Sequence, residues 1–405
     1  MIRVLFLTES FYPVLGGAEQ HILRLATRLA AEGWGATVVT RRSKLDWAPR
    51  ETLDDVRIVR VPPSGSSRRG KYGMLPFASA AVFREMGRHD LLVVRGTRVL
   101  GLPGVFAARS RGRRVVLQAE VNGEMSGEIY TWGTPLERGW AARVVRAATA
   151  LRNRWLLDAD AFVAMSRLIS DEFQAAGVPP ERVAYIPHGV DCARFVPATD
   201  EERAGLRSRL GIPASAIVVT YTGRLLRGKG LEDLVEAFGR LAAREPELRL
   251  FLVGSGGGQA LSVEDQLWNT VQAAGLGARV TFTGRVAHVE DYLRASDVFV
   301  FPSEFEALGL SLVEASACGL PCIGARTGGI VDVIEDSTSG LLFAPGDPDA
   351  LTEALGSLVA DPGRRRALGA RARAVALERF DEEDALARYK ALFREVIGVG
   401  QREAA

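Results

Sequence analysis

The 405-residue sequence has few of the residues that disulfide frameworks and metal sites need. It contains three cysteines and four histidines. Three cysteines are too few for a disulfide framework, and no histidine stands near them at the spacing of a metal site. We therefore interpret Cys318 and Cys322 as small, buried packing residues, and we expect no metal site.

Long apolar runs and a strong excess of one charge are also missing. No segment approaches the roughly 18 to 20 uninterrupted apolar residues that span a bilayer. Glu9 interrupts the short apolar start MIRVLFL, which we interpret as a strand rather than a signal peptide. The formal net charge of +2 gives little support for a nucleic-acid partner. These absences predict a cytoplasmic protein that does not bind nucleic acid.

Short β-rich runs alternate with amphipathic helical stretches throughout the chain. This alternation predicts an α/β protein with parallel sheets and helical crossovers. The predicted strands of the first half are residues 2–8, 36–40, 56–61, 91–95, 115–118, 161–165 and 183–186. Those of the second half are residues 217–221, 248–253, 280–283, 298–302, 322–324 and 340–343.

The length of the chain predicts two domains, because single hydrophobic cores stop growing at roughly 250 to 300 residues. A polar stretch that follows IPHGVD separates the two sets of strands. We expect one Rossmann-like domain over residues 1–195 and a second over residues 196–378. The helical segment 379–405 is expected to cross back to the first domain.

Two glycines stand between the first strand and the first helix. Gly16 and Gly17 precede Glu19 in a helix predicted over residues 18–31, whose apolar residues recur at helical spacing. Glycines at this point let backbone amides approach an anion closely. A tight turn into a helix also uses glycine, so a turn and a phosphate site are both open interpretations.

The loop after the first strand of the second domain carries two cations. Gly223 and Arg224 are followed by Lys229 and Gly230, just before a helix predicted to begin near Leu231. Arginine and lysine can stabilise the charge that grows on a departing diphosphate. The alternative interpretation is an ordinary solvated loop.

The most strongly patterned stretch is residues 295–346. Glu306 and Glu314 stand eight residues apart. If a helix begins at Gly309, then Glu306 lies before that helix and Glu314 lies within it. Carboxylates accept paired hydrogen bonds from neighbouring hydroxyls, and the free amides near Gly309 and Leu310 would add donors. We therefore expect Glu314 to hold a ribose diol and Glu306 to hold sugar hydroxyls.

Taken together, these motifs resemble the group 1 glycosyltransferases of retaining family four. The resemblance rests on GGAE at 16–19, GRL with KG at 223–230, IPHGVD at 186–191 and the E-x7-E stretch, and it covers nearly the whole chain. It implies the GT-B fold, in which two Rossmann-like domains face each other across a cleft. It also implies a nucleoside diphosphate sugar as donor, a sugar, lipid-linked or small-molecule acceptor, retention at the sugar, and no metal or other cofactor.

The resemblance also implies roles for individual residues. Arg224 and Lys229 would bind the diphosphate, Glu314 the ribose, and Glu306 the donor sugar together with the amides of Gly309 and Leu310. Further candidates for donor binding are Gly16, Gly17, Gly223, His188 and Arg285.

The chain departs from the family pattern at three places. Where many members carry a histidine at the end of the fifth strand, this chain has Gln118 and then Glu120. Glu120 is a candidate for acceptor binding or proton handling, and a solvated carboxylate is the alternative. His188 and Asp332 stand where relatives often have Asn and Glu. A non-catalytic sugar-nucleotide module, and a GT-B enzyme of other chemistry such as a phosphorylase or an epimerase, remain open as alternatives.

The segment 135–157 is both basic and amphipathic. Trp140, Leu151 and Trp155 alternate there with arginines such as Arg143 and Arg146. Such a helix can rest on anionic lipid, which would place the protein at the inner face of a membrane. A helix packed on the core with solvated arginines is the alternative.

Overall fold

The computed structural model describes residues 1–13, 16–65, 68–131, 139–259 and 261–398. It divides into two compact units. Unit 1 comprises Met1–Pro187 together with the segment that begins at Ala385, and unit 2 comprises His188–Asp384. Each unit is built on its own sheet. Within the described ranges, no helix is both long enough and apolar enough to cross a membrane.

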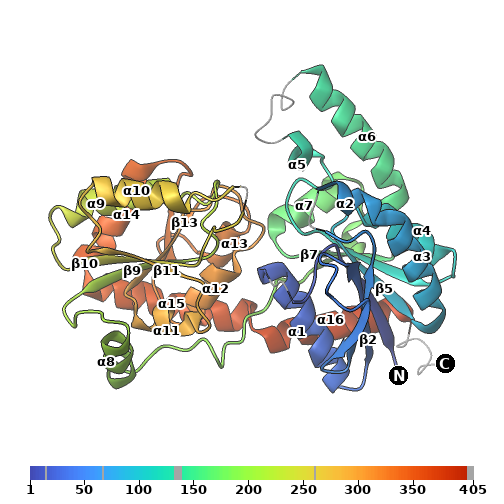
Figure 1. Ribbon diagram of the computed structural model, residues 1–405, viewed down its shortest axis with the longest axis horizontal. Coiled ribbons are helices and arrows are strands. Elements are labelled where there is room, and N and C mark those ends of the chain that lie inside the picture. The colour runs from blue at the N-terminus through green and yellow to red at the C-terminus, as the bar shows by residue number, and fades with distance from the viewer. Residues whose placement is uncertain (14–15, 66–67, 132–138, 260, 399–405) are drawn as a thin grey trace. The chain divides into compact units, whose positions relative to one another are not determined.

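The sheet of unit 1 has eight strands in the order β3-β4-β2-β1-β5-β6-β7-β8 (Figure 1). All neighbours pair in parallel except β3 and β4, which are antiparallel. The strands are β1 (Arg3–Leu7), β2 (Gly35–Arg41), β3 (Arg50–Leu53), β4 (Val56–Val61), β5 (Leu91–Arg95), β6 (Arg114–Gln118), β7 (Ala161–Ala164) and β8 (Val183–Tyr185).

Helices cover both faces of this sheet, because alternate side chains of a buried strand point to opposite faces. Val4 and Phe6 of β1 pack into a core with helix α1, while Leu7 lies on the face that α4 covers. The helices of unit 1 are α1 (Gly17–Ala31), α2 (Arg68–Gly73), α3 (Leu75–Glu85), α4 (Gly101–Arg109), α5 (Glu128–Thr131), α6 (Trp140–Leu156), α7 (Arg167–Ala175) and, from Ala385 on, α16 (Glu382–Ile397).

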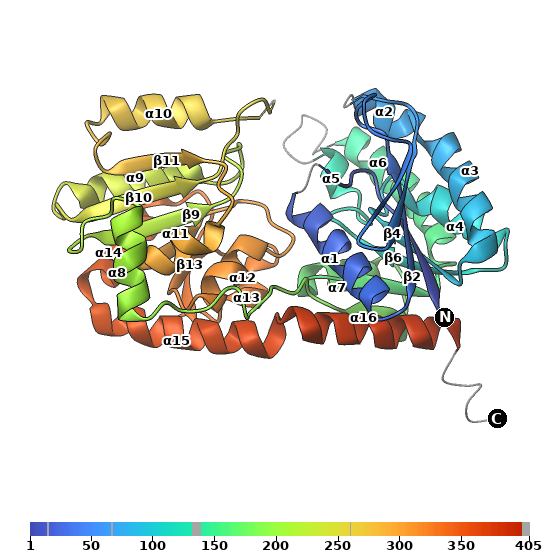
Figure 2. The same ribbon diagram turned by 60° about the horizontal axis from the view of Figure 1, so that its bottom comes forward.

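The last helix, α16, completes the core of unit 1. It lies beside α1 (Figure 2) and buries Tyr389 and Phe393 completely. The hydroxyl of Tyr389 is 3.3 Å from Nε2 of His21 and accepts a hydrogen bond of 3.1 Å from the amide of Gln118. The end of the chain thus supplies apolar surface and a polar anchor to the first half of the sequence.

We expect acid to destabilise unit 1 through His21. Burial, followed by the charges of Arg95 and Arg24, lowers the pKa of His21 from 6.5 to about 3. As pH falls below 6.5 the unfolded chain gains a proton that the folded chain excludes until about pH 3, so stability is lost across that window. The expected loss between pH 7 and pH 5 is about 2 kcal/mol.

Urea unfolding at the two pH values measures this loss. In His21→Gln the side chain cannot titrate, so the difference between the two pH values should shrink by the same amount. An unchanged pH dependence in His21→Gln would show that His21 does not carry the effect.

The sheet of unit 2 has six parallel strands in the order β11-β10-β9-β12-β13-β14. After β9, the next two strands therefore extend the sheet to the edge at β11. The chain then returns, and β12 pairs with the other side of β9. The strands are β9 (Ile217–Thr222), β10 (Leu248–Val253), β11 (Val280–Gly284), β12 (Val298–Phe301), β13 (Cys322–Ala325) and β14 (Gly340–Phe343).

Helices cover both faces of this second sheet. Figure 1 shows α9, α10 and α14 on one side of it and α11, α12 and α15 on the other. The helices of unit 2 are α8 (Asp200–Arg209), α9 (Leu231–Ala242), α10 (Glu264–Ala273), α11 (Val289–Ala295), α12 (Leu310–Ala317), α13 (Ile330–Val333), α14 (Pro348–Ala360) and α15 (Pro362–Arg379). The prediction of parallel sheets with helical crossovers is therefore confirmed.

Candidate functional site

The strand order of unit 2 creates a switch point between β9 and β12. The chain leaves β9 toward β10 on one side, and β12 lies on the other. In open parallel sheets, loops diverge at such a point at the carboxyl ends of the strands and leave room for a ligand. The loop that leaves β9 contains Arg224 and Lys229, and the loop that leaves β12 contains Glu306.

The structure brings two of the predicted site residues into direct contact. Nζ of Lys229 lies 2.7 Å from Oε2 of Glu306, across 77 residues of sequence. The two side chains are 19% and 20% exposed, so the pair is reachable from solvent but mostly enclosed. The ammonium also lies 6.0 Å from the centre of the Phe301 ring, which stacks on the buried ring of Tyr221. These aromatic rings form an apolar support beneath the ion pair.

Backbone contacts hold the two loops together. The amide of Glu304 donates to the carbonyl of Gly228 at 3.1 Å. Gly230 has φ of +62°, and a Cβ added there would lie 2.1 Å from the carbonyl oxygen of Pro302. Only glycine fits this left-handed position and this close approach between two backbones. The position of Lys229 relative to Glu306 therefore depends on the glycine that follows Lys229.

A third loop, which leaves β13, packs against the same place. The amide of Gly329 donates to the carbonyl of Glu306 at 3.1 Å, and the hydroxyl of Thr327 donates to the carbonyl of Glu304 at 3.2 Å. Glu306 is thus held from both sides, by its ion pair with Lys229 and by the backbone of a neighbouring loop. Such support fixes a carboxylate before a ligand arrives.

Helix α12 begins at the site, as the sequence predicted. Gly309 precedes its first residue, Leu310, with φ of +93° and no side-chain hydrogen bond at this cap. The first amides of an α-helix have no partner within the helix, and they carry the positive end of its dipole. Glu306 lies before this helix and Glu314 lies one turn inside it, which confirms the predicted placement of the two carboxylates.

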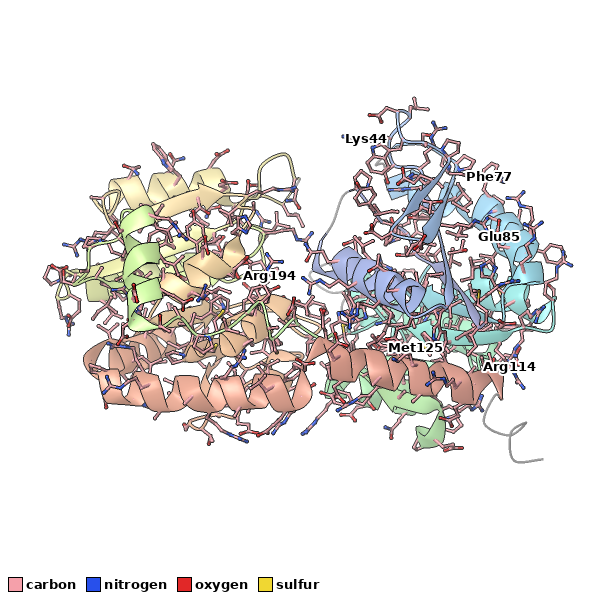
Figure 3. The ribbon with its side chains drawn as sticks, turned by 90° about the horizontal axis from the view of Figure 1, so that it is seen from below. Lys44, Phe77, Glu85, Arg114, Met125 and Arg194 are labelled. Atoms are coloured by element: carbon pink, nitrogen blue, oxygen red, sulfur yellow. The ribbon has the colours of Figure 1, made fainter. Side chains whose placement is uncertain are left out.

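Glu314 is partly buried and lies near a cation. The pKa of Arg194 is raised first by its hydrogen bond to Glu290 and further by the negative charge of Glu314. Arg194 is labelled in Figure 3. The site in unit 2 thus combines separate carboxylates, one paired with Lys229 and the other under the influence of Arg194.

The remaining predicted residues of unit 2 have different environments. Arg224 and Arg285 are exposed, in the loops that leave β9 and β11, and Gly223 directly follows β9. The hydroxyl of Tyr221 donates to the carbonyl of Arg224 at 3.1 Å. His188 is the first residue of unit 2 and is buried, at 3% exposure. The cation of Arg224 is thus solvent-accessible while its backbone is anchored.

Two buried hydroxyls were missed by sequence reasoning. Thr222 is the last residue of β9, and Ser303 follows β12 by two positions. Both are almost completely buried, and within the described part of the chain neither hydroxyl has a hydrogen-bond partner. Buried polar groups in proteins are nearly always hydrogen-bonded. These two hydroxyls are therefore candidates for hydrogen bonds to a ligand or to water. The Pro-Ser pair at 302–303 was the available signal in the sequence.

The glycines of unit 1 lie at the equivalent place, where β1 ends beside β5. Gly17 opens α1, and the amide of Gly16 donates to the carboxylate of Glu19 at 2.9 Å. That carboxylate also accepts from the hydroxyl of Ser10. The Gly16 amide is therefore satisfied within its own turn, which favours the turn interpretation for that residue. Gly17 remains a candidate.

Glu120 lies at the carboxyl end of β6. Its carboxylate is 3.6 Å from Nε of Arg95, and its side chain is 34% exposed. Burial raises the pKa of Glu120, Arg95 opposes that rise, and the nearby charges of Glu124 and Glu19 add to it. The carboxylate is thus accessible and easier to protonate than a free glutamate.

The neighbouring loop is held in place by two other carboxylates. Glu124 accepts from the amide and hydroxyl of Thr97 and from the amide of Glu120. Glu172 accepts from three amides of the loop, including that of Met125, which is labelled in Figure 3. Gln118, by contrast, is 2% exposed and donates to Tyr389 in the core. Of the two residues at this strand end, Glu120 is the accessible one.

Within the described residues, no group of three acidic, histidine or cysteine side chains could hold a metal ion. All three cysteines are buried and unpaired, as expected of packing residues. Burial raises the pKa of the Cys322 thiol to about 12.

Comparisons with known families cover both units. The family described as "Glycosyl transferases group 1" matches residues 202–375, and "Glycosyltransferase Family 4" matches residues 15–194. The chain is 32% identical to D-inositol 3-phosphate glycosyltransferase 1 of Catenulispora acidiphila, over 95% of this chain and 92% of that protein. It is 31% identical to a GDP-mannose-dependent alpha-(1-6)-phosphatidylinositol monomannoside mannosyltransferase of Mycolicibacterium smegmatis, over 93% and 94%.

Solved structures show the same fold. Sucrose-phosphate synthase from Thermosynechococcus elongatus matches with a TM-score of 0.82 and 24% identity, over 98% of this chain and 100% of that one. HepE from Anabaena, solved with UDP-glucose, matches with a TM-score of 0.75 and 22% identity, over 98% and 100%. These matches and the family matches agree with the motif resemblance. The chain therefore belongs to the group 1 glycosyltransferases and has their GT-B fold.

Proposed function

We propose that this protein transfers a sugar, with retention of anomeric configuration, from a nucleoside diphosphate sugar to a hydroxyl acceptor. The observation that carries the proposal is the contact between Lys229 and Glu306 at the switch point of unit 2. A cation and a carboxylate placed side by side match the two halves of such a donor. The cation suits the diphosphate, and the carboxylate suits the hydroxyls of the sugar.

In this proposal the loop after β9 binds the diphosphate. Arg224 and Lys229 neutralise its charge, and the backbone at Gly223 lies beside them. The uncapped start of α12, at Gly309 and Leu310, adds amides and the positive end of a helix dipole. As the bond to the sugar breaks, negative charge grows on the departing phosphate, so these groups bind the transition state more tightly than the ground state.

The carboxylates hold the rest of the donor. Glu306 accepts hydrogen bonds from the sugar hydroxyls, and Glu314 accepts from the ribose diol. Thr222 and Ser303 offer buried hydroxyls without partners at the same strand ends. Their burial without a partner supports a role for them in donor binding, because a bound donor would satisfy them.

The proposed chemistry needs no protein nucleophile. The acceptor oxygen attacks the anomeric carbon on the face from which the diphosphate leaves, so the new bond has the configuration of the old one. The carbon–oxygen bond to the phosphate breaks, the bond to the acceptor oxygen forms, and the acceptor proton passes to a phosphate oxygen. Glu120 in unit 1 is proposed to bind the acceptor, because its carboxylate is accessible and has a raised pKa.

We further propose that Arg224 and Lys229 supply the charge for which other transferases use a metal ion. On this proposal the donor sugar is a substrate and no cofactor is needed. Transfer measured after the protein is passed over a chelating resin should keep its rate within about twofold. A rate that falls and is restored by a divalent cation would overturn the metal-independent proposal, whatever the donor.

The names of the relatives suggest where to begin with substrates. The mannosyltransferase is named for GDP-mannose, and the Catenulispora protein for inositol 3-phosphate. Because HepE was solved with UDP-glucose, we propose UDP sugars as well as GDP sugars as first donors, and polyols and their phosphates as first acceptors.

Donor binding is tested by thermal unfolding with UDP, GDP, ADP and their sugars. A nucleotide present at 100 times its Kd stabilises the folded state by about 2.7 kcal/mol, which corresponds to about 5 to 10 °C for a domain of this size. We expect one base to give such a shift in the wild type and in Arg227→Ala, an exposed neighbour in the same loop. Lys229→Ala and Glu314→Ala should lose most of it.

No shift with any of these nucleotides would contradict the proposal for unit 2. Once a donor is found, NMR of the product gives the second test, because the coupling constant of the anomeric proton reports the configuration. Retention is expected. An inverted product would leave donor binding intact and overturn the proposed mechanism.

A further inference from the structure

Helix α6 carries a stripe of large apolar side chains that faces solvent. Trp140 is 78% exposed, Val144 56%, Leu151 59% and Trp155 56%. They follow one another at intervals of four, seven and four residues. At 3.6 residues per turn, these intervals place all four within an arc of about 60°. We call these four residues the outer stripe of α6.

The opposite face of α6 packs on the rest of unit 1. Ala142, Thr149, Asn153 and Leu156 are buried. The amide of Asn153 donates to the carbonyl of Met125 at 2.8 Å, and Arg152 donates to the carbonyl of Glu124 at 2.6 Å. Helix α6 thus packs on unit 1 with its arginines Arg143 and Arg146 exposed, but Trp140, Leu151 and Trp155 are not part of the packed face. Hydrogen bonds to a loop and the complete burial of Leu156 together hold the inner face.

Positive charge borders the outer stripe. Arg143 and Arg154 are exposed, and on the helix they lie beside the stripe on one flank, with Arg146 further round. No acidic residue occurs between Trp140 and Leu156. A helix with an apolar, tryptophan-containing face and a cationic flank is typical of the membrane interface, where it buries the apolar face and pairs the cations with lipid phosphates.

The apolar surface continues onto the next helix. Phe106 of α4 is 53% exposed, and its ring lies 5.5 Å from that of Trp155. Figure 1 shows α6 beside α4 at the end that carries Trp155 and extending beyond the rest of unit 1 at the end that carries Trp140. The outer stripe is therefore presented along the whole helix.

We propose that the outer stripe of α6, together with Phe106 and the flanking arginines, docks unit 1 on an anionic lipid surface. The positive charge of the flanking arginines favours a lipid surface over a second copy of the chain as the partner. Pairing of two stripes would bring the arginines of both copies around one patch without an acidic residue on either helix, whereas lipid phosphates neutralise them. Tryptophan at both ends also suits the boundary between headgroups and acyl chains.

Docking through α6 has a consequence for the acceptor. The inner face of α6 holds the carbonyls of Glu124 and Met125, in the loop that follows Glu120. A bilayer at the outer face therefore lies one helix away from the residue proposed to bind the acceptor. This consequence rests on the proposed function and favours an acceptor hydroxyl carried by a lipid. The docking itself does not depend on it.

Vesicle co-sedimentation of the full chain, without any nucleotide, tests the docking. We expect binding to vesicles of phosphatidylcholine with phosphatidylglycerol, and at least about tenfold less binding to phosphatidylcholine alone or at 1 M salt. Trp140→Ser with Leu151→Ser, and separately Arg143→Glu with Arg154→Glu, should each lower binding about tenfold or more. The matched control is Trp268→Ser with Arg366→Glu, two exposed residues of unit 2.

Circular dichroism and donor binding verify that the variants fold. Because the replaced side chains are exposed, both signals should equal those of the wild type. Equal vesicle binding by wild type and both α6 variants would overturn the proposal, and so would an absence of binding to anionic vesicles. A lipid-free dimer in sedimentation velocity that Trp140→Ser with Leu151→Ser dissociates would overturn it in favour of a second copy. Failure of the donor proposal would leave every one of these vesicle results unchanged.

Discussion

Replacing Lys229 with alanine should lower kcat/KM for sugar transfer by about 10²- to 10³-fold. This is the usual effect of removing one group that stabilises charge in a transition state within an enclosed site. The Lys229 side chain is 19% exposed and its ammonium lies 6.0 Å from the centre of the Phe301 ring, so water replaces it poorly. Initial rates with the donor identified by thermal unfolding measure the effect.

Arg227→Ala is the matched control, because Arg227 is an exposed cation two residues away in the same loop. Its kcat/KM should stay within about twofold of the wild type, as expected for an exposed charge. Equal losses in the two variants would mean that the loop acts only through its overall charge. No loss in Lys229→Ala would remove this lysine from the proposed mechanism.

The ion pair also leads to a prediction for a variant of Glu306, in which the product should bind more tightly although the rate of transfer falls. In Glu306→Gln the ammonium of Lys229 no longer has a carboxylate partner, so a nucleoside diphosphate should bind more tightly while transfer slows. In the double variant Lys229→Ala with Glu306→Gln the losses in rate should not add, because the two groups are in contact. Additive losses would show that the two residues act separately.

Gly230→Ala should damage both the stability and the activity of unit 2. Its φ of +62° is costly for any residue with a Cβ, and the new Cβ would lie 2.1 Å from the carbonyl oxygen of Pro302. The left-handed backbone alone costs about 1 to 2 kcal/mol. Relief of the clash must then move the loop that carries Glu306, and a displacement of about 1 Å in such a site lowers the rate about 10²-fold.

Gly205→Ala provides the comparison. Gly205 lies exposed in helix α8, and a Cβ added there would meet nothing within 4 Å. Alanine should stabilise unit 2 by up to about 1 kcal/mol and leave transfer unchanged. Urea unfolding measures the stability of the two variants, and initial rates measure their activity. If the close approach at Gly230 requires glycine, Gly230→Ala should lose stability and activity while Gly205→Ala should lose neither. Normal stability and activity in Gly230→Ala would show that the loops can adjust.

The fold class was readable from local patterns. Buried parallel strands appear as short apolar runs, and amphipathic helices appear as apolar residues at a spacing of 3.6. Each predicted strand therefore matches an observed strand to within one residue at both ends. The strand β3 was missed. It is a four-residue antiparallel edge strand, Arg50–Leu53, without a buried residue, and such a strand has no apolar signal to detect.

Parts of the site were also local. Gly309 marks the start of α12, so the sequence alone placed Glu306 before the helix and Glu314 within it. The apolar stripe of α6 was visible as a periodic pattern as well. Its direction was not, because a periodic pattern says that one face of a helix is apolar and not which way that face points.

Only the tertiary structure decided which distant residues meet. Lys229 contacts Glu306 because β12 returns to lie beside β9, and Gln118 is turned into the core because α16 places Tyr389 there, 271 residues further along the chain. The outward direction of the α6 stripe likewise depends on the burial of Leu156 and on hydrogen bonds from the inner face to the loop after β6. The sequence by itself determined the elements, their class and the chemistry of the motifs, since these depend on neighbours within a few residues. Strand order, helix direction and the pairing of distant residues depend on the packing energy of each unit as a whole. A pattern of a few neighbouring residues does not reveal that energy.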